Sequence, residues 1–349
     1  MAAVGIDIGF GFTKAYNGRD AIAFKSIFGE ATDIQYREQL LGTPRAEEHL
    51  HVETGGKGYF VGELAERQSN VRSFTLDQDH LISNFARLMT ITALSRLSEG
   101  NQSVRVVTGL PISYYKRHRD EVAALLTGKH TTTIIDHLGN RSESVINITH
   151  VRTIPQPFGS LFNHMLNDMA EVANKRFVQE KIGIIDVGFR TCDCTIADKT
   201  RYSERGSHTT ESGISKAYTA IAARLQELTG VKIELYRLYE AIDRGSIKIR
   251  GKTIDLKPLI EEGFSKLASS IAAEIDRLWA DDWDIDLMVI TGGGGAALAP
   301  YLTPALNGEV MALDSAADAR LNNVRGYWKY GMNVWGKELR AASASSGAS

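Results

Sequence analysis

Two stretches of this chain, about 180 residues apart, each place an aspartate at the end of an apolar run and glycine directly beyond it. The first is VGIDIGFGFTKAY, with Asp7 before Gly9 and Gly11, and the second is IGIIDVGFRTCDCTI, with Asp186 before Gly188. A buried carboxylate is costly unless a cation or a metal pairs with it. Glycines let the backbone turn tightly or approach a ligand closely. The residues alone leave open a plain β-hairpin with a solvated aspartate.

Two such hairpins that face each other can hold the phosphates of a nucleotide, because backbone N–H groups at tight turns form anion-binding concavities. Asp7 and Asp186 then hold Mg²⁺, directly or through water, which suits a cation that keeps several waters. Lys14 is a candidate phosphate ligand or a surface lysine. Thr13 and Thr191 donate hydroxyls to phosphate oxygens or serve as ordinary strand residues.

Asp193 follows the second turn, where it faces the cleft near the metal or the attacking water, or lies on the solvated face of its hairpin. A different glycine cluster, TGGGGAAL from Thr291 to Leu298, lies between a predicted buried strand and a helix. Consecutive glycines allow a flat ligand to lie on the backbone, and a helix start favours negative charge. We expect an adenosine and its phosphates there, with a loose loop as the alternative.

Composition excludes several classes of protein. The chain has 349 residues, 43% of them hydrophobic and 23% charged, with a net charge of −2, which is typical of a soluble protein of one large or two medium domains. A net charge near zero gives no sign of the basic surface that binds nucleic acids. No apolar run is long enough to span a bilayer. The two cysteines, Cys192 and Cys194, are expected to pack in the core. We expect a reduced, cytoplasmic protein, with the four tryptophans as core or interface anchors.

The order of predicted elements alternates strands and helices. Strands are expected within 3–24, within 53–65, at 104–111, 131–137 and 143–153, within 181–198 and from 286; helices are expected at 79–100, 113–128, 155–175, 213–230 and 257–281.

The five motifs in this order resemble the superfamily of actins, sugar kinases and heat-shock chaperones. VGIDIGFGFTKAY and IGIIDVGFRTCDCTI resemble its two phosphate motifs, and VITGGGGAAL resembles its adenosine motif. IPQPFGSLFNHM and ADARLNNVRGYWKYG, at 317–331, resemble its two connecting helices. Within the superfamily, PQPFGSLF, DVGFRTCD and NNVRGYWKYG are similar to the prokaryotic actin-like ATPases, meaning plasmid-segregation (ParM-type) filaments and archaeal actin-like proteins.

The resemblance implies an α/β fold of two similar actin-like (RNase H-like) domains around a nucleotide cleft, each with a smaller outer subdomain. Domain I would comprise 1–155 and 318–340, with an outer subdomain at about 25–75. Domain II would comprise 156–317, with an outer subdomain at about 213–284, and residues 341–349 would form a disordered tail. Gly159 and Gly326, on the two connecting helices, would let those helices cross closely, either as hinge or shear elements between the halves or as ordinary helix packing.

The resemblance also assigns roles to residues. Asp7 and Asp186 would organise Mg²⁺ and belong with Gln156 to the catalytic set, in which Gln156 positions the attacking water, a role expected to give slow hydrolysis. Phe10 departs from the small hydroxyl residue of animal-type actins, so its side chain is not expected to contact the γ-phosphate as that residue does. Arg190 replaces a glycine of many relatives and is either a phosphate clamp or a surface residue. The nucleotide-binding set is Gly9, Phe10, Gly11, Phe12, Thr13, Lys14, Gly188, Phe189, Arg190, Thr191, Asp193, Gly292, Gly293, Gly294 and Gly295.

The function that follows is an actin-like ATPase that forms nucleotide-dependent filaments and segregates plasmid DNA or positions other cargo. Its cofactor would be Mg²⁺, and its substrate ATP, with GTP as an alternative. Its partners would be further copies of itself and an adaptor protein that links it to DNA or other cargo, without direct nucleic-acid or membrane binding. A small-molecule (sugar-type) kinase on the same fold is the alternative, and a chaperone-like peptide binder is disfavoured because no substrate-binding domain follows the last motif. Fold alone does not choose among these.

Overall fold

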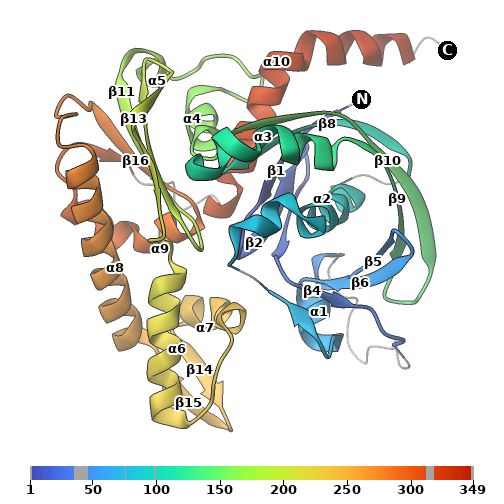
Figure 1. Ribbon diagram of the computed structural model, residues 1–349, viewed down its shortest axis with the longest axis horizontal. Helices are drawn as coiled ribbons and strands as arrows, with labels where there is room; N and C mark the ends of the chain where they lie inside the picture. Colours follow the sequence, from blue (N-terminus) through green and yellow to red (C-terminus); the bar gives the residue numbers. More distant parts are fainter. Residues whose placement is uncertain (1, 35–45, 75, 98–99, 312–317, 347–349) are drawn as a thin grey trace. The chain divides into compact units, whose positions relative to one another are not determined.

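Residues 1–175 fold together with residues 320–349, and residues 176–319 form a second unit of the computed structural model (Figure 1). The structure describes the whole chain except residues 1, 35–45, 75, 98–99, 312–317 and 347–349. Residues 156–175, which the sequence assigned to the second domain, belong to the first unit. The reason is that α4 (Phe158–Met165) packs against the last helix, α10 (Asn322–Ser346). The predicted boundary at residue 317 lies outside the described residues.

A ten-stranded sheet forms the body of the first unit, in the order β3-β2-β1-β8-β10-β9-β5-β6-β4-β7. Strand β1 runs antiparallel to β2 and parallel to β8, which runs parallel to β10. The strands are β1 (Ala2–Ile8), β2 (Phe12–Tyr16), β3 (Ala21–Lys25), β4 (Phe28–Glu30), β5 (Leu50–Thr54), β6 (Lys57–Val61), β7 (Arg72–Ser73), β8 (Gln102–Leu110), β9 (Gly128–Ile135) and β10 (Arg141–Pro155).

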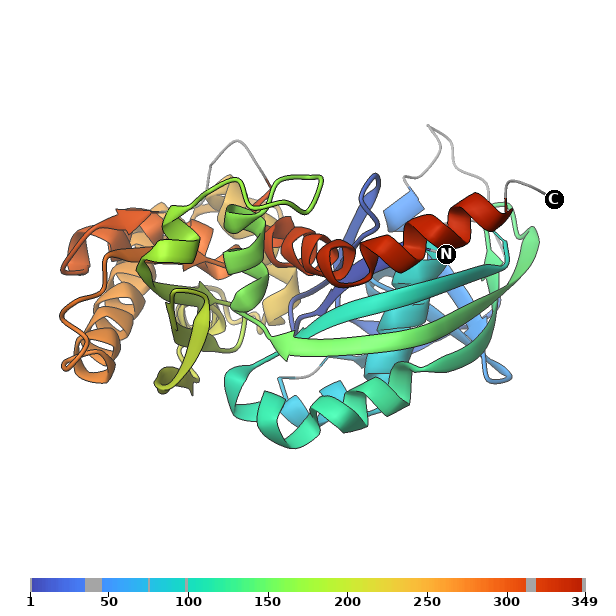
Figure 2. The ribbon, with the colours of Figure 1, turned by 90° about the horizontal axis from the view of Figure 1, so that it is seen from above.

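Helices cover both faces of this sheet. Helix α10 runs along one face and α3 (Ile112–Leu126) along the other (Figure 2). Helix α2 (Asn84–Leu97) packs against β1, β2 and β3, and it is buried on most of its circumference, as a helix enclosed by a sheet must be. The short α1 (Glu63–Gln68) follows β6. Single 3-10 turns lie at Ala46–Glu48, Gln78–Ile82 and Ala319–Leu321.

The predicted outer subdomain at 25–75 is continuous with the main sheet, because β5 pairs antiparallel with β9. It also has a small core of its own around Phe60, Leu64 and Ala65. Residues 35–45 and 75 of this subdomain lie outside the described residues. The outer strands therefore extend the sheet that carries Asp7 and have local packing of their own.

The second unit contains a five-stranded sheet in the order β13-β12-β11-β16-β17 and a separate hairpin, β14–β15. Strand β11 pairs antiparallel with β12 and parallel with β16, as β1 pairs with β2 and β8. The strands are β11 (Lys181–Val187), β12 (Cys192–Asp198), β13 (Arg201–Thr210), β14 (Ser246–Ile249), β15 (Lys252–Asp255), β16 (Leu287–Thr291) and β17 (Val310–Met311). The helices are α5 (Arg176–Gln179), α6 (Ser215–Thr229), α7 (Tyr239–Arg244), α8 (Lys257–Leu278) and α9 (Gly293–Leu302), with 3-10 turns at Leu235–Arg237 and Thr303–Ala305.

The helix predicted over 155–175 is much shorter, since only Phe158–Met165 is α-helical. Beyond it, Asn167 Oδ1 accepts hydrogen bonds from the backbone N–H groups of Met169 and Glu171. Ala170 adopts a φ of 60°. An asparagine side chain that bonds to nearby backbone groups competes with the helix, and the chain leaves α4 in a turn.

The predicted disordered tail is also wrong in part. Helix α10 continues to Ser346, so residues 341–346 are helical, while 347–349 lie outside the described residues. Three of these six residues are alanine, which has the highest intrinsic helix propensity.

Candidate functional site

Each unit contains one hairpin of the same construction, and both begin at a buried aspartate. Asp7 is 3% exposed at the end of β1, and Asp186 is 2% exposed at the end of β11. The first turn closes through a hydrogen bond from Gly9 N to Phe12 O (3.1 Å), and the second through one from Gly188 N to Thr191 O (2.8 Å). The two predicted hairpins therefore have matching four-residue turns, and neither aspartate is solvated.

In the first hairpin, Lys14 is the cross-strand neighbour of Asp7 and forms an ion pair with it, with 2.8 Å between Nζ and Oδ2. The side chain of Lys14 is 13% exposed. A Cβ built on Gly9 would lie 3.0 Å from Lys14 Nζ, so this ammonium group also lies beside the glycine turn. Lys14 is therefore not a surface lysine, and its charge stabilises the buried carboxylate of Asp7.

Ser26 fixes the first turn from the following strand. Its backbone N–H donates to Gly11 O (3.0 Å), and its hydroxyl donates to Gly9 O (2.5 Å). Thr13 is fully buried, and its hydroxyl shares a 2.9 Å hydrogen bond with that of Ser26. These contacts make Thr13 a buried residue of its strand, and its role toward phosphate stays a prediction. Phe10 is 7% exposed, so its ring packs into the protein.

The second turn is fixed by the segment before α6. The N–H groups of Gly213, Ile214 and Ser215 donate to the carbonyls of residues 190, 188 and 189, at 2.8–3.1 Å. A Cβ on Gly213 would lie 2.2 Å from the carbonyl carbon of Arg190, so only glycine allows this approach. Sequence reasoning missed both anchors, Ser26 and Gly213, because neither lies in a recognisable motif.

Asp193 lies directly across the strand pair from Asp186, and it is 1% exposed. Its two carboxylate oxygens accept hydrogen bonds from the hydroxyls of Thr191 (3.1 Å) and Thr209 (2.5 Å). The alternative of a solvated Asp193 is therefore wrong, and its place near the metal or the attacking water stays a prediction. The hydroxyl of Thr191 therefore binds Asp193, the residue paired with Asp186 on the neighbouring strand.

Two further residues of the second turn make contacts within their own unit. Arg190 Nη2 forms a 2.7 Å ion pair with Glu211 Oε1. The ring of Phe189 packs edge-on against Tyr218 and Tyr239. The first turn has a comparable contact, in which the guanidinium of Arg320 lies over the ring of Phe12, 5.0 Å from its centre.

The four-glycine run divides between a cap and the first turn of a helix. Gly292 precedes α9 with a φ of 85°, and Gly293, Gly294 and Gly295 are its first three residues. A Cβ on Gly292 would lie 2.3 Å from Asp186 Oδ1, and one on Gly294 would lie 2.8 Å from Gly188 O. The run therefore brings the start of α9 against the Asp186 hairpin, and it leaves Gly293 as the exposed glycine.

Gln156 lies in the turn between β10 and α4, two residues before the helix in which the sequence placed it. Its N–H donates to Leu110 O (2.9 Å), and its carbonyl accepts from Gly159 N (3.1 Å) and from the hydroxyl of Tyr327 (3.2 Å). Tyr327 is fully buried on α10. The backbone of Gln156 is thus fixed by three elements of the first unit, and Tyr327 is a residue that sequence reasoning did not single out.

Helices α4 and α10 cross at Gly159 and Gly326, as predicted. A Cβ on Gly326 would lie 1.7 Å from Gly159 O, so the two backbones are in direct contact. A buried hydrogen-bond network flanks the crossing: Ser160 Oγ donates to Asn323 Oδ1 (2.8 Å), and Asn322 Nδ2 donates to Ser160 Oγ (2.6 Å). The satisfied polar groups fix a single alignment of the helices.

Lys329 on α10 caps the end of α4. Its Nζ donates to Leu166 O (2.8 Å) and Asn163 O (3.1 Å), and burial lowers the pKa of this lysine. A cation at a helix C-terminus satisfies the last carbonyls and stabilises the helix dipole. The crossing and the cap together join α4 firmly to α10.

Cys192 and Cys194 are free and buried on β12, with their sulfurs 3.8 Å apart. The contact with Cys194 and the burial of the thiol raise the pKa of Cys192. Both thiols therefore have the core-packing role that was predicted for them.

The aspartates fit the predicted metal chemistry, although the described residues contain no group of three His, Cys, Asp or Glu side chains arranged as a metal site. Mg²⁺ commonly takes one or two protein carboxylates and completes its shell with water and substrate phosphates. Each unit contains one buried carboxylate beside a glycine turn, and each of these carboxylates by itself is a donor of that kind. Asp7 and Asp186 are the residues that would hold it.

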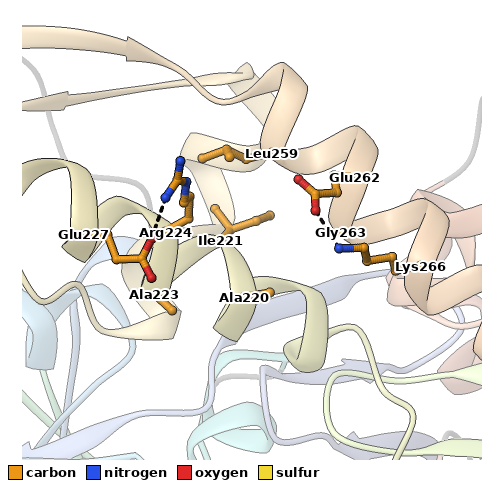
Figure 3. A pocket seen from close by; sticks show the side chains of 9 residues that line it. All are labelled: Ala220, Ile221, Ala223, Arg224, Glu227, Leu259, Glu262, Gly263 and Lys266. Carbon is orange, nitrogen blue, oxygen red and sulfur yellow. Dashed lines mark hydrogen bonds and ion pairs between the residues drawn. The ribbon is translucent and has the colours of Figure 1, made fainter.

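A separate cavity of about 420 Å³ lies between α6 and α8 (Figure 3). Its four charged side chains pair within its own lining, Arg224 with Glu227 and Lys266 with Glu262, each at 2.6 Å. Ala220, Ala223 and Gly263 form the small residues of its wall. The cavity therefore has no unmatched charge to recognise an anionic nucleotide, and it is distinct from the hairpin turns.

No helix in the described part of the chain combines the length and the apolar character needed to cross a membrane. Comparison with curated protein sequences gave no match.

Comparison with family models and solved structures gave clear matches. Residues 5–159 match the family model of the actin like proteins N terminal domain, and residues 184–303 match the C-terminal model of the archaeal actin homologue, MreB-like. A 15-stranded ParM filament from Clostridium botulinum is 25% identical, with a TM-score of 0.79 over 95% of this chain and 98% of that one.

Two further structures share the fold. The archaeal actin homologue Ta0583 in complex with ADP is 19% identical, with a TM-score of 0.76 over 95% of this chain and 99% of that one. Bacillus thuringiensis ParM with AMPPNP is 18% identical, with a TM-score of 0.71 over 95% and 98%. The predicted fold of two actin-like α/β units is thus confirmed, and the chain belongs to the actin-like proteins.

Proposed function

We propose that this actin-like protein is a slow, Mg²⁺-dependent ATPase that polymerises in a nucleotide-dependent manner. The observation that carries the proposal is the repeated hairpin, with a buried aspartate before a glycine turn in each unit. In both turns, carbonyl oxygens accept hydrogen bonds from the same unit, through Ser26 in one and residues 213–215 in the other. Rigid turns of this kind suit phosphate binding through backbone N–H groups.

The proposed division of labour follows from the contacts in each unit. The turns at 9–12 and 188–191 bind phosphates, Lys14 adds a positive charge beside the first turn, and the start of α9 holds the adenosine. When bound, Mg²⁺ would neutralise phosphate charge at Asp7 and Asp186. Gln156 orients a water for attack on the terminal phosphate, a positioning role that suits slow hydrolysis.

The cellular role that we propose is that of a filament which segregates plasmid DNA or positions other cargo through an adaptor protein. Its support is the likeness to a ParM that forms a 15-stranded filament, over nearly the full length of both chains. ATP is the proposed substrate, because two of the relatives compared, Ta0583 and Bacillus thuringiensis ParM, are in complex with ADP and AMPPNP.

The test is electron microscopy of the purified protein with Mg-ATP, Mg-AMPPNP or Mg-ADP, together with calorimetry of nucleotide binding. Filaments are expected with ATP and AMPPNP, and fewer with ADP. Tight nucleotide binding without filaments in any state would contradict the assembly part of the proposal, and absence of nucleotide binding would contradict both parts.

Replacing Gln156 with alanine should leave the nucleotide affinity within about two-fold of wild type and slow phosphate release by about 10- to 100-fold. Orienting a water lowers the barrier without adding to ground-state affinity. Single-turnover phosphate release and calorimetry measure the two quantities. Since the backbone of Gln156, rather than its side chain, makes the contacts with Tyr327 and Leu110, the fold should be retained. Lost affinity with normal turnover of bound ATP would make Gln156 a binding residue instead.

A further inference from the structure

One segment of the second unit, residues 209–215, follows the second glycine turn along its length. Its last three residues donate backbone hydrogen bonds to carbonyls of the turn, and Glu211 forms an ion pair with Arg190. Its first residue, Thr209, is paired with Asp193 across β12 and β13, and its hydroxyl donates a 2.5 Å hydrogen bond to Oδ1 of that carboxylate. The later contacts fix the backbone of the turn, whereas Thr209 binds a side chain just beyond it.

Hydroxyl groups stabilise the buried charge of Asp193. This carboxylate is 1% exposed, and it lies across the strand pair from Asp186, a second buried carboxylate. Like charges at directly opposite positions destabilise a pair of strands. Hydrogen bonds to an ionised group are among the strong ones, and Asp193 accepts one on each oxygen, from Thr191 and from Thr209. The two hydroxyls therefore hold the carboxylate of Asp193 in one position.

The direction of the Thr191 hydroxyl follows from the same contacts. An ionised carboxylate only accepts hydrogen bonds, whereas a hydroxyl group has one proton and two lone pairs. Thr191 donates its proton to Oδ2 of Asp193 (3.1 Å), so it has no proton left for a phosphate oxygen. The oxygen of Thr191 therefore presents lone pairs, which accept a hydrogen bond from water and repel a phosphate oxygen.

We infer that Thr209 is a positioning residue for hydrolysis, because it holds Asp193 where that carboxylate fixes the direction of the Thr191 hydroxyl. The inference rests on the proposed function, in which the backbone of the second turn binds phosphates. Thr191 then accepts a hydrogen bond from the attacking water, which lies beside those phosphates. This role replaces the one considered from the sequence, in which the hydroxyl of Thr191 donates to a phosphate oxygen.

Removal of the Thr209 hydroxyl tests this role. Thr209→Val should slow single-turnover phosphate release by about 10-fold and leave nucleotide affinity within about two-fold of wild type, because a misplaced water raises the barrier without weakening ground-state binding. Thr209→Ser keeps a hydroxyl and should restore the rate. Thr195→Val is the matched control, since Thr195 is also buried on β12 and shares a 2.5 Å hydrogen bond with the hydroxyl of Ser207. This control should hydrolyse ATP as wild type does.

Thr191→Val tests the same chain of hydrogen bonds from its other end. It should slow hydrolysis by about 100-fold, again with affinity for Mg-AMPPNP within about two-fold of wild type in calorimetry. The double variant T191V/T209V should be no slower than T191V alone, because residues that act through one another are not additive. Thermal unfolding by circular dichroism identifies the variants that are folded at the assay temperature.

Three results would overturn the inference and leave the proposed ATPase intact. The first is a T191V variant that binds AMPPNP at least about 10-fold more weakly but hydrolyses bound ATP at the normal rate, which would make Thr191 a phosphate donor. The second is a double variant in which the two losses of rate multiply. The third is a Thr195→Val control that is as slow as Thr209→Val. A wild-type protein that neither binds nor hydrolyses ATP would contradict the proposed function as well.

Discussion

Alanine at Asp186 is expected to remove the Mg²⁺ dependence of nucleotide binding and to lower ATP turnover by about 100-fold or more. The carboxylate of Asp186 is buried at the end of β11, beside Gly292 and across from Asp193. Stabilisation of phosphoryl charge by a metal ion is worth several kcal/mol, and about 1.4 kcal/mol corresponds to a factor of ten. Asp7→Ala should act in the same direction, and it also leaves Lys14 without its ion-pair partner.

Calorimetry with ATP, in the presence and absence of Mg²⁺, measures this dependence. Asp198→Ala is the matched control, since Asp198 lies at the far, exposed end of the same hairpin. The control should bind Mg-ATP as wild type does. If Mg²⁺ raises the ATP affinity of Asp186→Ala as much as it raises that of Asp198→Ala, Asp186 does not hold the metal.

Gly326→Ala is expected to destabilise the first unit by more than about 3 kcal/mol, at or beyond the upper end of ordinary overpacking. The added methyl group would lie 1.7 Å from Gly159 O and 2.9 Å from Asn163 N, so backbone must move against backbone. The polar network at the crossing would be displaced with it. Urea unfolding monitored by circular dichroism measures the loss.

Gly263→Ala makes the same chemical change within α8, where the new methyl group would meet nothing closer than 3.7 Å. This control is expected to be neutral or to stabilise its helix by up to about 1 kcal/mol, because alanine has the higher helix propensity. If Gly326→Ala lowers the free energy of unfolding and Gly263→Ala leaves it unchanged or raises it, the destabilisation comes from the backbone contact at the crossing and not from helix propensity. A small effect of Gly326→Ala would show that α4 and α10 can separate cheaply.

The sequence predicted the local pattern of the fold well, because strand and helix periodicity is a local property. The paired strands before and after each glycine turn, and the helices α6 and α8, lie within a few residues of their predicted bounds. The continuation of the main sheet through β5 and β9 was not predictable, since this pairing joins segments distant in the sequence. The end of α4 was not predictable either, because it depends on hydrogen bonds from backbone N–H groups to the side chain of Asn167. In the turn beyond it, Ala170 has a positive φ, a conformation that alanine rarely adopts.

In the candidate site, too, local features could be predicted from the sequence and tertiary contacts could not. Asp7, Asp186 and the glycine turns could be found because their residue types are unusual at the ends of apolar strands. The partners that hold them, such as Lys14 against Asp7 and Gly213 against Arg190, are set by tertiary packing. The roles assigned to the nucleotide-binding residues remain predictions, whereas the buried positions of Thr13 and Asp193 are properties of the fold itself.

The most direct test of the central claim is sedimentation of the wild-type protein over a range of concentrations with Mg-ATP, Mg-AMPPNP and Mg-ADP. If the γ-phosphate favours the conformation that filament contacts also favour, each promotes the other, because such coupling is reciprocal. Polymer should appear above a threshold concentration with ATP or AMPPNP and disassemble as ATP is hydrolysed. ATP turnover that requires a small acceptor molecule, with no polymer at any concentration, would contradict the account and identify a kinase instead.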